Sequence, residues 1–231
     1  MQPYFFPYIG YWQLMNYVDA FVILDDVNFI KKGFIHRNQI LLNGGSHRIG
    51  MPLEKPSQNK LINQTRLKAE ARDIHSLTET IKHAYSRAPH FTEVEEIIRL
   101  VLEYDSRDLV EFLTNSMSLV NNYLGIDTRL LRSSSINKDA SASGEARILS
   151  ICKAMDATQY VNPSGGRTIY TPEKFTNEGI DFRFLDPDLQ RIKYRQFDNE
   201  FVENLSIIDV MMFNDVKKIS DFLTMFSLSA Y

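Results

Sequence analysis

The sequence predicts an α/β protein with a mostly parallel, Rossmann-like sheet, one β-hairpin and a helical insert. Strand-type and helix-type segments alternate in both flanks of the 231-residue chain. Between them, from about residue 68 to residue 125, apolar residues recur at helical spacing of three and four. An Asn-Gly-Gly-Ser turn at 43–46 separates two strand-like runs, which is a hairpin signal. These patterns favour a single domain over residues 1–231.

The elements follow from the local patterns. The run Phe21–Leu24 is apolar and is followed by two aspartates, which predicts a buried strand that delivers carboxylates to a sheet edge. Gly125 is a natural end for the last helix of the insert. The remaining expected elements, in order, are a helix in YWQLMNY, a strand in TRLLRSS, a helix in GEARILSICKAMDA, a strand in TQYVNP, a helix in TPEKFTNEG, a strand in IDFRFLD, and closing helices in LSIIDVMMFN and DVKKISDFLTMF.

Composition excludes several classes of protein. The net charge of −3 argues against bulk electrostatic binding of nucleic acid or anionic membranes. No run of about 18 apolar residues predicts a membrane span, and the prolines near the start break any signal peptide, so a cytoplasmic location is expected. The single cysteine, Cys152, lies in a helical pattern and is expected to be a buried, inert thiol.

The opening MQPYFFPYIGYWQL is dense in aromatic residues, proline and glycine. A loop through Pro3 and Pro7 that runs into a helix places free backbone N–H groups where an anion can bind, with Gly10 allowing close approach. The alternative interpretation is an aromatic plug over the core. Because such a turn normally follows a buried strand, the pattern also predicts that a short first strand precedes Met1 in the natural protein.

A second polar cluster follows the first expected strand. Asp25 and Asp26 end this strand, and His36, Arg37 and Asn38 come close behind. An aspartate there can accept a proton from an amine or hold a metal, and Arg37 can grip a phosphate or carboxylate. The structural alternative is a surface salt bridge, which contributes only ~0–1 kcal/mol. Asp25, Asp26 and His36 are the candidate catalytic residues.

Two further clusters follow later strands. In NPSGGRTIY the amides around Gly165 and Gly166 can cradle an oxyanion that Arg167 neutralises, or the segment is a plain turn. Asn162 and Tyr170 are the specificity contacts of this candidate site. Asp209, in NLSIIDV, is either part of a site or an acid in the first turn of a helix. The histidines have no paired spacing that predicts a zinc site.

The long motifs QPYFFPYIGYWQL, FVILDDVNF…GFIHRNQI, YVNPSGGRTIY and FVENLSIIDVMMFN resemble the WbqC-like protein family, in the same order and through essentially the whole chain. The resemblance implies a role in surface-polysaccharide (O-antigen) biosynthesis, with transfer of an amino acid such as glycine to an amino sugar as the suggested activity. It adds Gln2, Pro3 and Tyr4 to the candidate substrate-binding residues, whereas KKGFIHRN departs modestly from the commoner form of that motif.

The segment PYIGY is also similar, more distantly, to the His-x-Gly-His turn with which nucleotidylyltransferases and class I aminoacyl-tRNA synthetases bind ATP phosphates. Tyr8 and Tyr11 stand where that turn has histidines. Tyrosine is neutral at pH 7, so it would stabilise a charged leaving group less than a histidine does.

The leading hypothesis is an aminoacyl or acyl transferase that acts on an amino sugar or sugar nucleotide. The alternatives are a nucleotidyl-transferase-like or adenylate-forming enzyme, and a non-catalytic sugar-nucleotide-binding subunit of the same pathway. Mg²⁺ and a nucleotide are compatible cofactors, and the sequence leaves the acyl donor, the acceptor sugar and the oligomeric state open.

Overall fold

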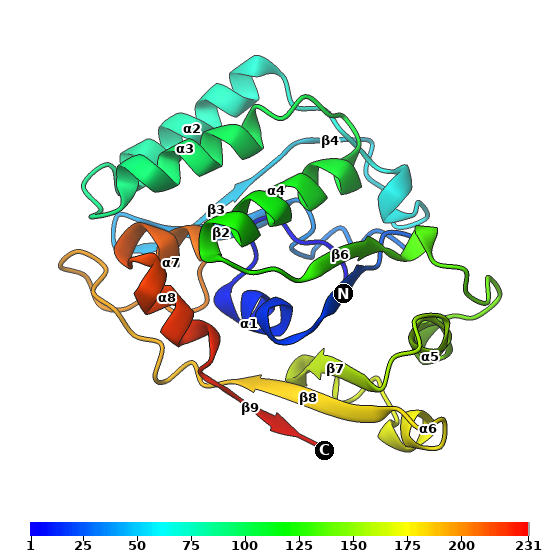
Figure 1. Cartoon of the computed structure of the whole chain (residues 1–231). Helices are drawn as coiled ribbons and strands as arrows, with labels where there is room; N and C mark the ends of the chain where they lie inside the picture. The colour runs from blue at the N-terminus through cyan, green and yellow to red at the C-terminus, as the bar shows by residue number, and fades with distance from the viewer. Residues whose placement is uncertain (231) are drawn as a thin grey trace.

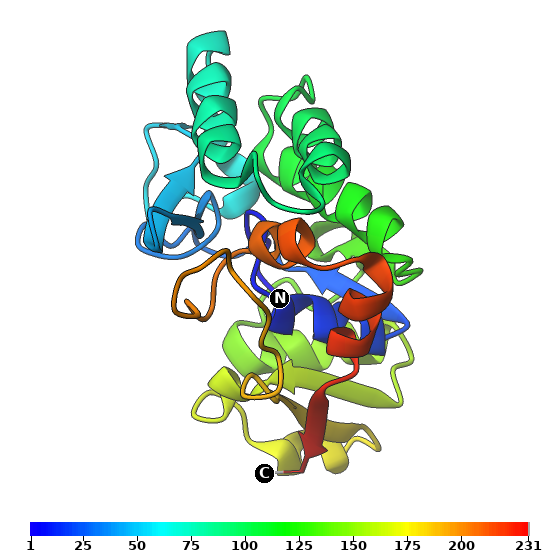
Figure 2. The same cartoon turned by 90° about the vertical axis from the view of Figure 1, so that its left-hand side faces the viewer.

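The computed structural model describes residues 1–230, which form a mixed α/β fold arranged in three tiers (Figure 1). Helices form the upper tier. A pair of parallel strands and one helix lie in the middle, and a three-stranded sheet closes the lower end. The same tiers are visible from the side in Figure 2.

The upper tier is the helical insert that the sequence predicts. Helices α2 (Ala71–Tyr85) and α3 (Phe91–Leu102) lie side by side, and α4 (Leu109–Leu124) packs against α3. Each helix turns its apolar stripe inward, which is the reason for the three-and-four spacing in the sequence. Asp108 caps the first turn of α4, and Gly125 ends it in the left-handed conformation (φ 70°), as expected for a C-terminal glycine.

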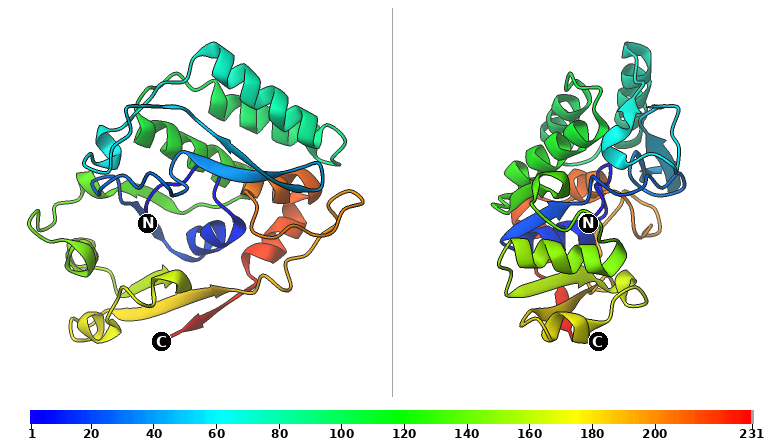
Figure 3. Two further views of the ribbon diagram at one scale, coloured as in Figure 1. Left: turned by 180° about the vertical axis from the view of Figure 1, so that it is seen from behind. Right: turned by 90° about the vertical axis from the view of Figure 1, so that its right-hand side faces the viewer.

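The predicted hairpin is present. Strands β2 (Arg37–Leu42) and β3 (Gly45–Gly50) pair antiparallel, and Asn43 and Gly44 form the two-residue turn with positive φ of 51° and 75°. Figure 3 shows this hairpin between the insert and the middle tier. It is followed by short pieces of structure: β4 (Leu53–Glu54), a 3₁₀ turn (Ile62–Gln64) and β5 (Arg66–Leu67).

The middle tier contains α1 (Ile9–Tyr17) and the parallel strands β1 (Ala20–Ile23) and β6 (Arg129–Arg132). Phe21 and Ile23 are buried on the same face of β1 as α1 and belong to the main core. β1 is thus the buried strand that the apolar run predicts, and Asp25 and Asp26 follow its carboxyl end.

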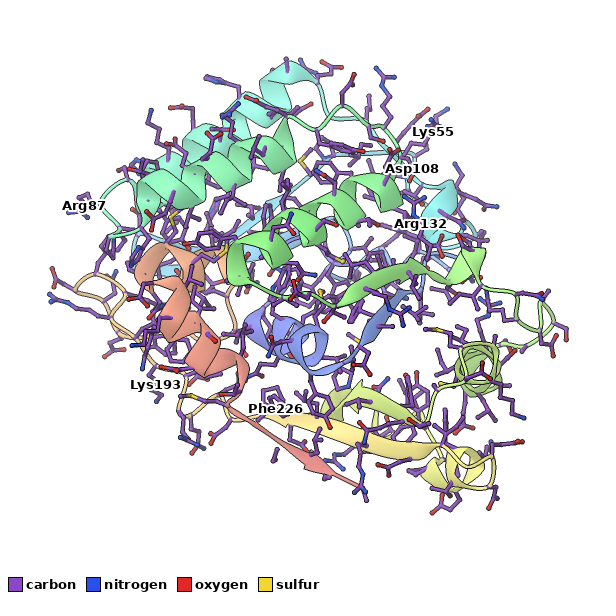
Figure 4. The ribbon with its side chains drawn as sticks, in the orientation of Figure 1. Lys55, Arg87, Asp108, Arg132, Lys193 and Phe226 are labelled. Carbon is purple, nitrogen blue, oxygen red and sulfur yellow. The ribbon has the colours of Figure 1, made fainter. Side chains whose placement is uncertain are left out.

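The lower tier is a sheet in the order β7-β8-β9. β7 (Gln159–Pro163) and β8 (Asp181–Pro187) are parallel, whereas β9 (Phe226–Ser229) is antiparallel to β8. The prediction that the chain closes with helices alone is wrong, because β9 follows the last helix. The ring of Phe226, which is labelled in Figure 4, packs edge-on against the ring of Tyr17 on α1, with the ring centroids 5.6 Å apart. This contact joins β9 to the middle tier.

Helices α5 and α6 lie at one end of the molecule, whereas α7 and α8 lie at the other (Figure 1). Cys152 on α5 is 5% exposed, and burial raises its thiol pKa to about 11, so the expected inert thiol is confirmed as a buried one. The bounds are α5 (Gly144–Ala154), α6 (Pro172–Thr176), α7 (Ile207–Phe213) and α8 (Val216–Leu223), with 3₁₀ turns at Ser133–Ser135 and Ser164–Gly166.

The α/β class is confirmed, but the continuous Rossmann-like sheet is absent from residues 1–230. The strands form four small sheets, and the two parallel pairs, β1 with β6 and β7 with β8, belong to different ones. Two parallel strands alone do not make a doubly wound sheet, and among the described residues no hydrogen-bonded ladder joins β1 to β7. Within the same residues no helix is long and apolar enough to cross a membrane.

Candidate functional site

The polar residues at the carboxyl ends of β1 and β6 form one connected cluster. Asp25 is 1% exposed, and both of its carboxylate oxygens are bound by Ser134: the backbone N–H donates to Oδ1 at 2.9 Å and the hydroxyl donates to Oδ2 at 2.5 Å. Ser134 lies in the turn directly after β6. Asp25 therefore links the carboxyl end of β1 to the turn after β6. Its buried carboxylate is not accessible to a ligand.

Asp26 is the more accessible of the two carboxylates, with its side chain 18% exposed. Lys138 Nζ lies 2.8 Å from its Oδ2, and Arg147 donates to its backbone carbonyl at 2.7 Å. The guanidinium is still 3.8 Å from Oδ1, which has no hydrogen-bond partner among the described residues. Oδ1 of Asp26 is thus buried beside Arg147 without a hydrogen bond of ordinary geometry, while Oδ2 is paired with Lys138.

The charges around Asp26 set its protonation state. Burial raises the pKa of Asp26, but the hydrogen-bonding side chains of Lys138 and Ser133 and the positive charges of Lys138 and Arg147 outweigh burial and leave that pKa below the ordinary value. Asp26 is therefore a carboxylate at neutral pH. Such a group accepts a hydrogen bond from an amine or attracts an ammonium more readily than it removes a proton.

Helix α5 connects this cluster to the loop after β7. Arg147, near its start, reaches Asp26, and Glu145 in the same turn accepts from the backbone N–H of Thr171 and from Lys174 at 2.6 Å. The first turn of α5 thereby contacts two of the clusters that the sequence singles out, namely the two aspartates and the glycine-rich loop.

Within that loop the charged and polar side chains are engaged internally. Arg167 donates to Asp186 and to Ser229, each at 2.7 Å, and its guanidinium stacks over the ring of Phe184 at 4.7 Å. The charge of Arg167 is therefore already paired with the carboxylate of Asp186. The Arg167 side chain remains about one-third exposed.

Of the other predicted residues of this loop, Asn162, Tyr170 and Gly166 pack against neighbouring side chains, whereas Gly165 does not. Asn162 is buried and donates to the hydroxyl of Tyr160 at 2.7 Å, and the ring of Tyr170 lies 5.9 Å from that of Tyr160. A Cβ on Gly166 would lie 2.3 Å from Asn162 Oδ1, whereas Gly165 is exposed and meets nothing within 4 Å. The backbone at Gly165 is therefore accessible, whereas position 166 requires glycine because a Cβ there would clash with Asn162.

The opening segment is mainly an aromatic plug. Phe5 and Phe6 are fully buried, and Asn38 holds them by donating to their carbonyls at 3.0 and 2.8 Å. Tyr11 is buried and donates to the carbonyl of Gln2 at 2.8 Å, so its hydroxyl faces the loop rather than a ligand. Figure 1 shows the chain start inside the fold, beside β1.

The outer part of the same segment is more accessible. Tyr4 and Tyr8 are half-buried, whereas Pro3 and Gly10 are buried. The ring of Tyr8 lies over Gly10, where an added Cβ would approach it to 2.6 Å. This glycine is needed because the tyrosine covers the first turn of α1, which leaves little room there for an anion.

His36 and Arg37 lie apart, in a cavity of about 530 Å³ between the hairpin and α2. His36 Nδ1 is 3.0 Å from the carbonyl of Met51, and burial lowers its pKa, so the ring is neutral at pH 7. Arg37 donates to the carbonyl of Gly33 at 3.0 Å. His47 and Arg48 of β3 also line this cavity, so its basic side chains outnumber the one carboxylate there, Asp73.

Asp209 lies in the first turn of α7, as the structural interpretation of NLSIIDV expects, and its side chain is in the core, apart from the other clusters. It is fully buried and accepts from Tyr85 at 2.7 Å, from Tyr194 at 2.7 Å and from Gln196 at 2.6 Å. Burial raises its pKa and outweighs these three hydrogen bonds. Ser206 caps the helix instead.

Sequence reasoning missed Ser134, Lys138 and Arg147, which complete the cluster around the aspartates. A usable signal was present, because SSSINKDA is a polar run directly after an expected strand. Among residues 1–230 no group of three or more histidine, cysteine, aspartate or glutamate side chains is placed to hold a metal ion.

The fold and this cluster define a mixed α/β protein with charged groups gathered at the carboxyl ends of parallel strands. The family model described as the WbqC-like protein family matches residues 2–221, so the chain belongs to that family. It is also 27% identical over 226 residues to Uncharacterized protein Rv1507c of Mycobacterium tuberculosis (strain ATCC 25618 / H37Rv), with 96% of this chain and 95% of that protein covered. No solved structure matches significantly.

Proposed function

We propose that the protein transfers an acyl or aminoacyl group, such as glycyl, to the amine of a nucleotide-linked sugar in bacterial surface-polysaccharide synthesis. The observation that carries the proposal is the unpartnered Oδ1 of Asp26, held between Lys138 and Arg147. In this proposal the Asp26 carboxylate, whose side chain is 18% exposed, accepts the N–H of the sugar amine, and the two cations together with Arg167 contact phosphate or carboxylate oxygens.

The chemistry needs little from the protein beyond placement. The sugar amine attacks the carbonyl carbon of an activated acyl donor, a C–N bond forms, and the bond from that carbon to the leaving group breaks. Asp26 orients the amine, and the proton that the nitrogen loses passes to water. If a nucleotide and Mg²⁺ take part, they supply activation of the carboxylate, which these residues do not provide.

The test is an in vitro transfer assay with UDP- and dTDP-linked amino sugars, glycine and ATP, read by the mass of one added glycyl group. Asp26→Asn should lower turnover by at least ~100-fold, since it loses the acceptor charge. Asp198→Asn, a change at a carboxylate that is 90% exposed, should leave turnover unchanged and serves as the matched control. Equal activity in the two variants would refute the role of Asp26.

A non-catalytic sugar-nucleotide-binding subunit is the second candidate. It is favoured by the internal engagement of Asp25, Asn38 and Asp209, which leaves few free groups for chemistry. If the wild-type chain binds one of these sugar nucleotides but no transfer occurs with glycine plus ATP, a glycyl thioester or glycyl-tRNA, this second function replaces the first.

A further inference from the structure

The charged residues are distributed unevenly along the chain. Residues 31–68, here called the basic segment, contain eight of the 26 lysines and arginines but only one of the 29 aspartates and glutamates, Glu54. This segment therefore carries a net charge of +7, and the rest of the chain carries −10. The overall charge of −3, which argues against bulk binding of nucleic acid, is thus an average over two regions of opposite sign.

The cations of the basic segment are not used to stabilise the fold. Seven of the eight side chains are exposed, and Arg37 is half-buried. Within residues 1–230 none of the eight forms an ion pair, whereas ten of the other eighteen lysines and arginines do. Of the eight, only Arg37 donates a side-chain hydrogen bond to another described residue, at the carbonyl of Gly33. Such a density of unpaired positive charge is typical of a surface that binds a polyanion.

Two of these cations share a concave site on the hairpin. The hairpin lies on the side of the molecule that faces the viewer in the left view of Figure 3. Arg37 and Arg48 project from the same face of it, because Arg37 pairs with Gly50 and Arg48 lies two residues before that glycine. Both arginines line the cavity of about 530 Å³ beside α2, where Asp73 is the one carboxylate. Two guanidinium groups in one cavity suit a phosphate.

Apolar side chains accompany the lysines at the start of the basic segment. Ile30 and Phe34, which are 44% and 50% exposed, flank Lys31 and Lys32. The ring of Phe34 lies against that of the half-buried Tyr4, with the ring centroids 6.1 Å apart. An exposed aromatic ring among lysines and arginines is the arrangement on which the bases of single-stranded RNA stack.

The basic segment also borders the Asp26 cluster. Its 3₁₀ turn is hydrogen-bonded to the chain on either side of Asp26. The N–H of Asn63 donates to the carbonyl of Asp25, and the N–H of Ile62 donates to that of Val27, both at 2.9 Å. A polyanion bound along this segment can therefore extend to the carboxyl end of β1, where the proposed transfer takes place.

We propose that the basic segment binds an RNA that carries the aminoacyl group as an ester at its 3′ end, and that this end reaches Asp26. The inference rests on the proposed function and names its donor. The sugar amine attacks the ester carbonyl carbon, a C–N bond forms, and the C–O bond to the terminal ribose breaks. The proton that the nitrogen loses ends on the ribose oxygen by way of water. The ester supplies the activation that the residues around Asp26 do not provide.

An anionic bilayer is the other polyanionic surface that lysines with exposed apolar residues can bind. The cavity favours RNA, because a flat bilayer reaches only side chains that protrude. A single phosphodiester group, in contrast, can enter a concave site and meet Arg37 and Arg48 together. Binding to vesicles is therefore a contrary outcome of the tests.

Binding is measured by fluorescence anisotropy of a labelled glycine tRNA transcript at salt concentrations from about 50 to 200 mM. Arg48→Ala combined with Lys60→Ala removes two exposed cations of the basic segment. This double change should weaken binding by at least ~10-fold and reduce the slope of log affinity against log salt by about 2. Lys193→Ala combined with Lys217→Ala removes the same charge from exposed lysines outside the segment and should change neither quantity.

The stacking contact is tested at Phe34, whose exposed ring can be changed without opening the core. Phe34→Leu keeps an apolar side chain but removes the flat ring, so it should weaken binding of the transcript by roughly 5-fold or more. Phe34→Tyr keeps the ring and should bind as the wild-type chain does. Equal affinities for these two variants would contradict base stacking at this position.

Three results would overturn the proposal. Equal loss of affinity in the two double variants would show that the basic segment is not the docking surface. Binding of phosphatidylglycerol vesicles, with no binding of the transcript, would assign the segment to a membrane surface. Protection of the hairpin from hydrogen exchange by inorganic pyrophosphate, again with no binding of the transcript, would assign the cavity to a small phosphorylated ligand.

Failure of the RNA donor and failure of the proposed function give different results. Anisotropy needs no turnover, so binding that depends on Arg48 and Lys60, with no transfer from glycyl-tRNA, would count against the proposed function alone. Glycyl transfer from free glycine and ATP that the Arg48 and Lys60 double variant leaves unchanged would refute the RNA donor alone. Asp26→Asn should bind the transcript as the wild-type chain does and lose transfer.

Discussion

Burial of the α-amino group of Met1 makes the stability of the chain depend on pH in a calculable way. The amine donates to the carbonyl of Val22, and desolvation lowers its pKa from 8.0 to about 5. The folded state therefore binds this proton less tightly than the unfolded state does. Its contribution to stability is complete above pH 8 and is lost as the pH falls from 8 to 5.

The size of the loss follows from the pKa shift. A shift of three units corresponds to about 4 kcal/mol of unfolding free energy at the acidic end of this window. Acetylation of Met1 removes the titrating proton and keeps an N–H that can donate to Val22. The acetylated chain should therefore be more stable than the free chain at pH 5.5 by about 3 kcal/mol, and the difference should shrink toward pH 8.5.

Urea unfolding of both chains at pH 8.5, 7.0 and 5.5 measures this difference. His36, whose pKa is also lowered by burial, titrates equally in the two chains and cancels in the comparison. A stability difference that does not grow as the pH falls would refute the reasoning that the amine is buried and neutral in the folded protein.

Three other changes test the packing around the predicted residues. Asn38→Ala should cost about 2–3 kcal/mol in urea unfolding, since two carbonyls of the opening loop lose their buried donor. Gly166→Ala should lower the free energy of unfolding by about 1–3 kcal/mol because its Cβ meets Asn162. Gly165→Ala should change it by less than about 0.5 kcal/mol. Equal thermal midpoints for the two variants would contradict the packing of this loop. Cys152 should react with iodoacetamide at pH 7.5 about 100-fold more slowly in the folded protein than in urea, and a comparable rate would show an accessible thiolate.

Local signals in the sequence were sufficient for most elements of the fold. Apolar spacing located α2, α3 and α4, and the turn at Asn43 located the hairpin, because both depend on neighbours in the chain. β9 was missed since its residues pair with β8 from more than 35 positions away, and nothing local distinguishes them from the end of a helix.

The candidate site was predicted less completely. The rule that ligands bind at the carboxyl ends of strands drew attention to Asp25 and Asp26. Sequence could not reveal that Ser134 binds both carboxylate oxygens of Asp25, or that Asp26 keeps one oxygen without a hydrogen bond of ordinary geometry. The sequence also could not indicate that Arg167 pairs with Asp186, since the two residues meet only when β7 and β8 lie side by side.

The most direct test of the proposed function is hydrogen exchange of the wild-type chain with and without a saturating UDP-linked amino sugar. The proposal predicts protection at the end of β1 around Asp26, in the turn from Ser134 to Lys138, and in the loop from Gly165 to Tyr170. Protection confined to the basic cavity beside His36, or no protection with any sugar nucleotide, would contradict it.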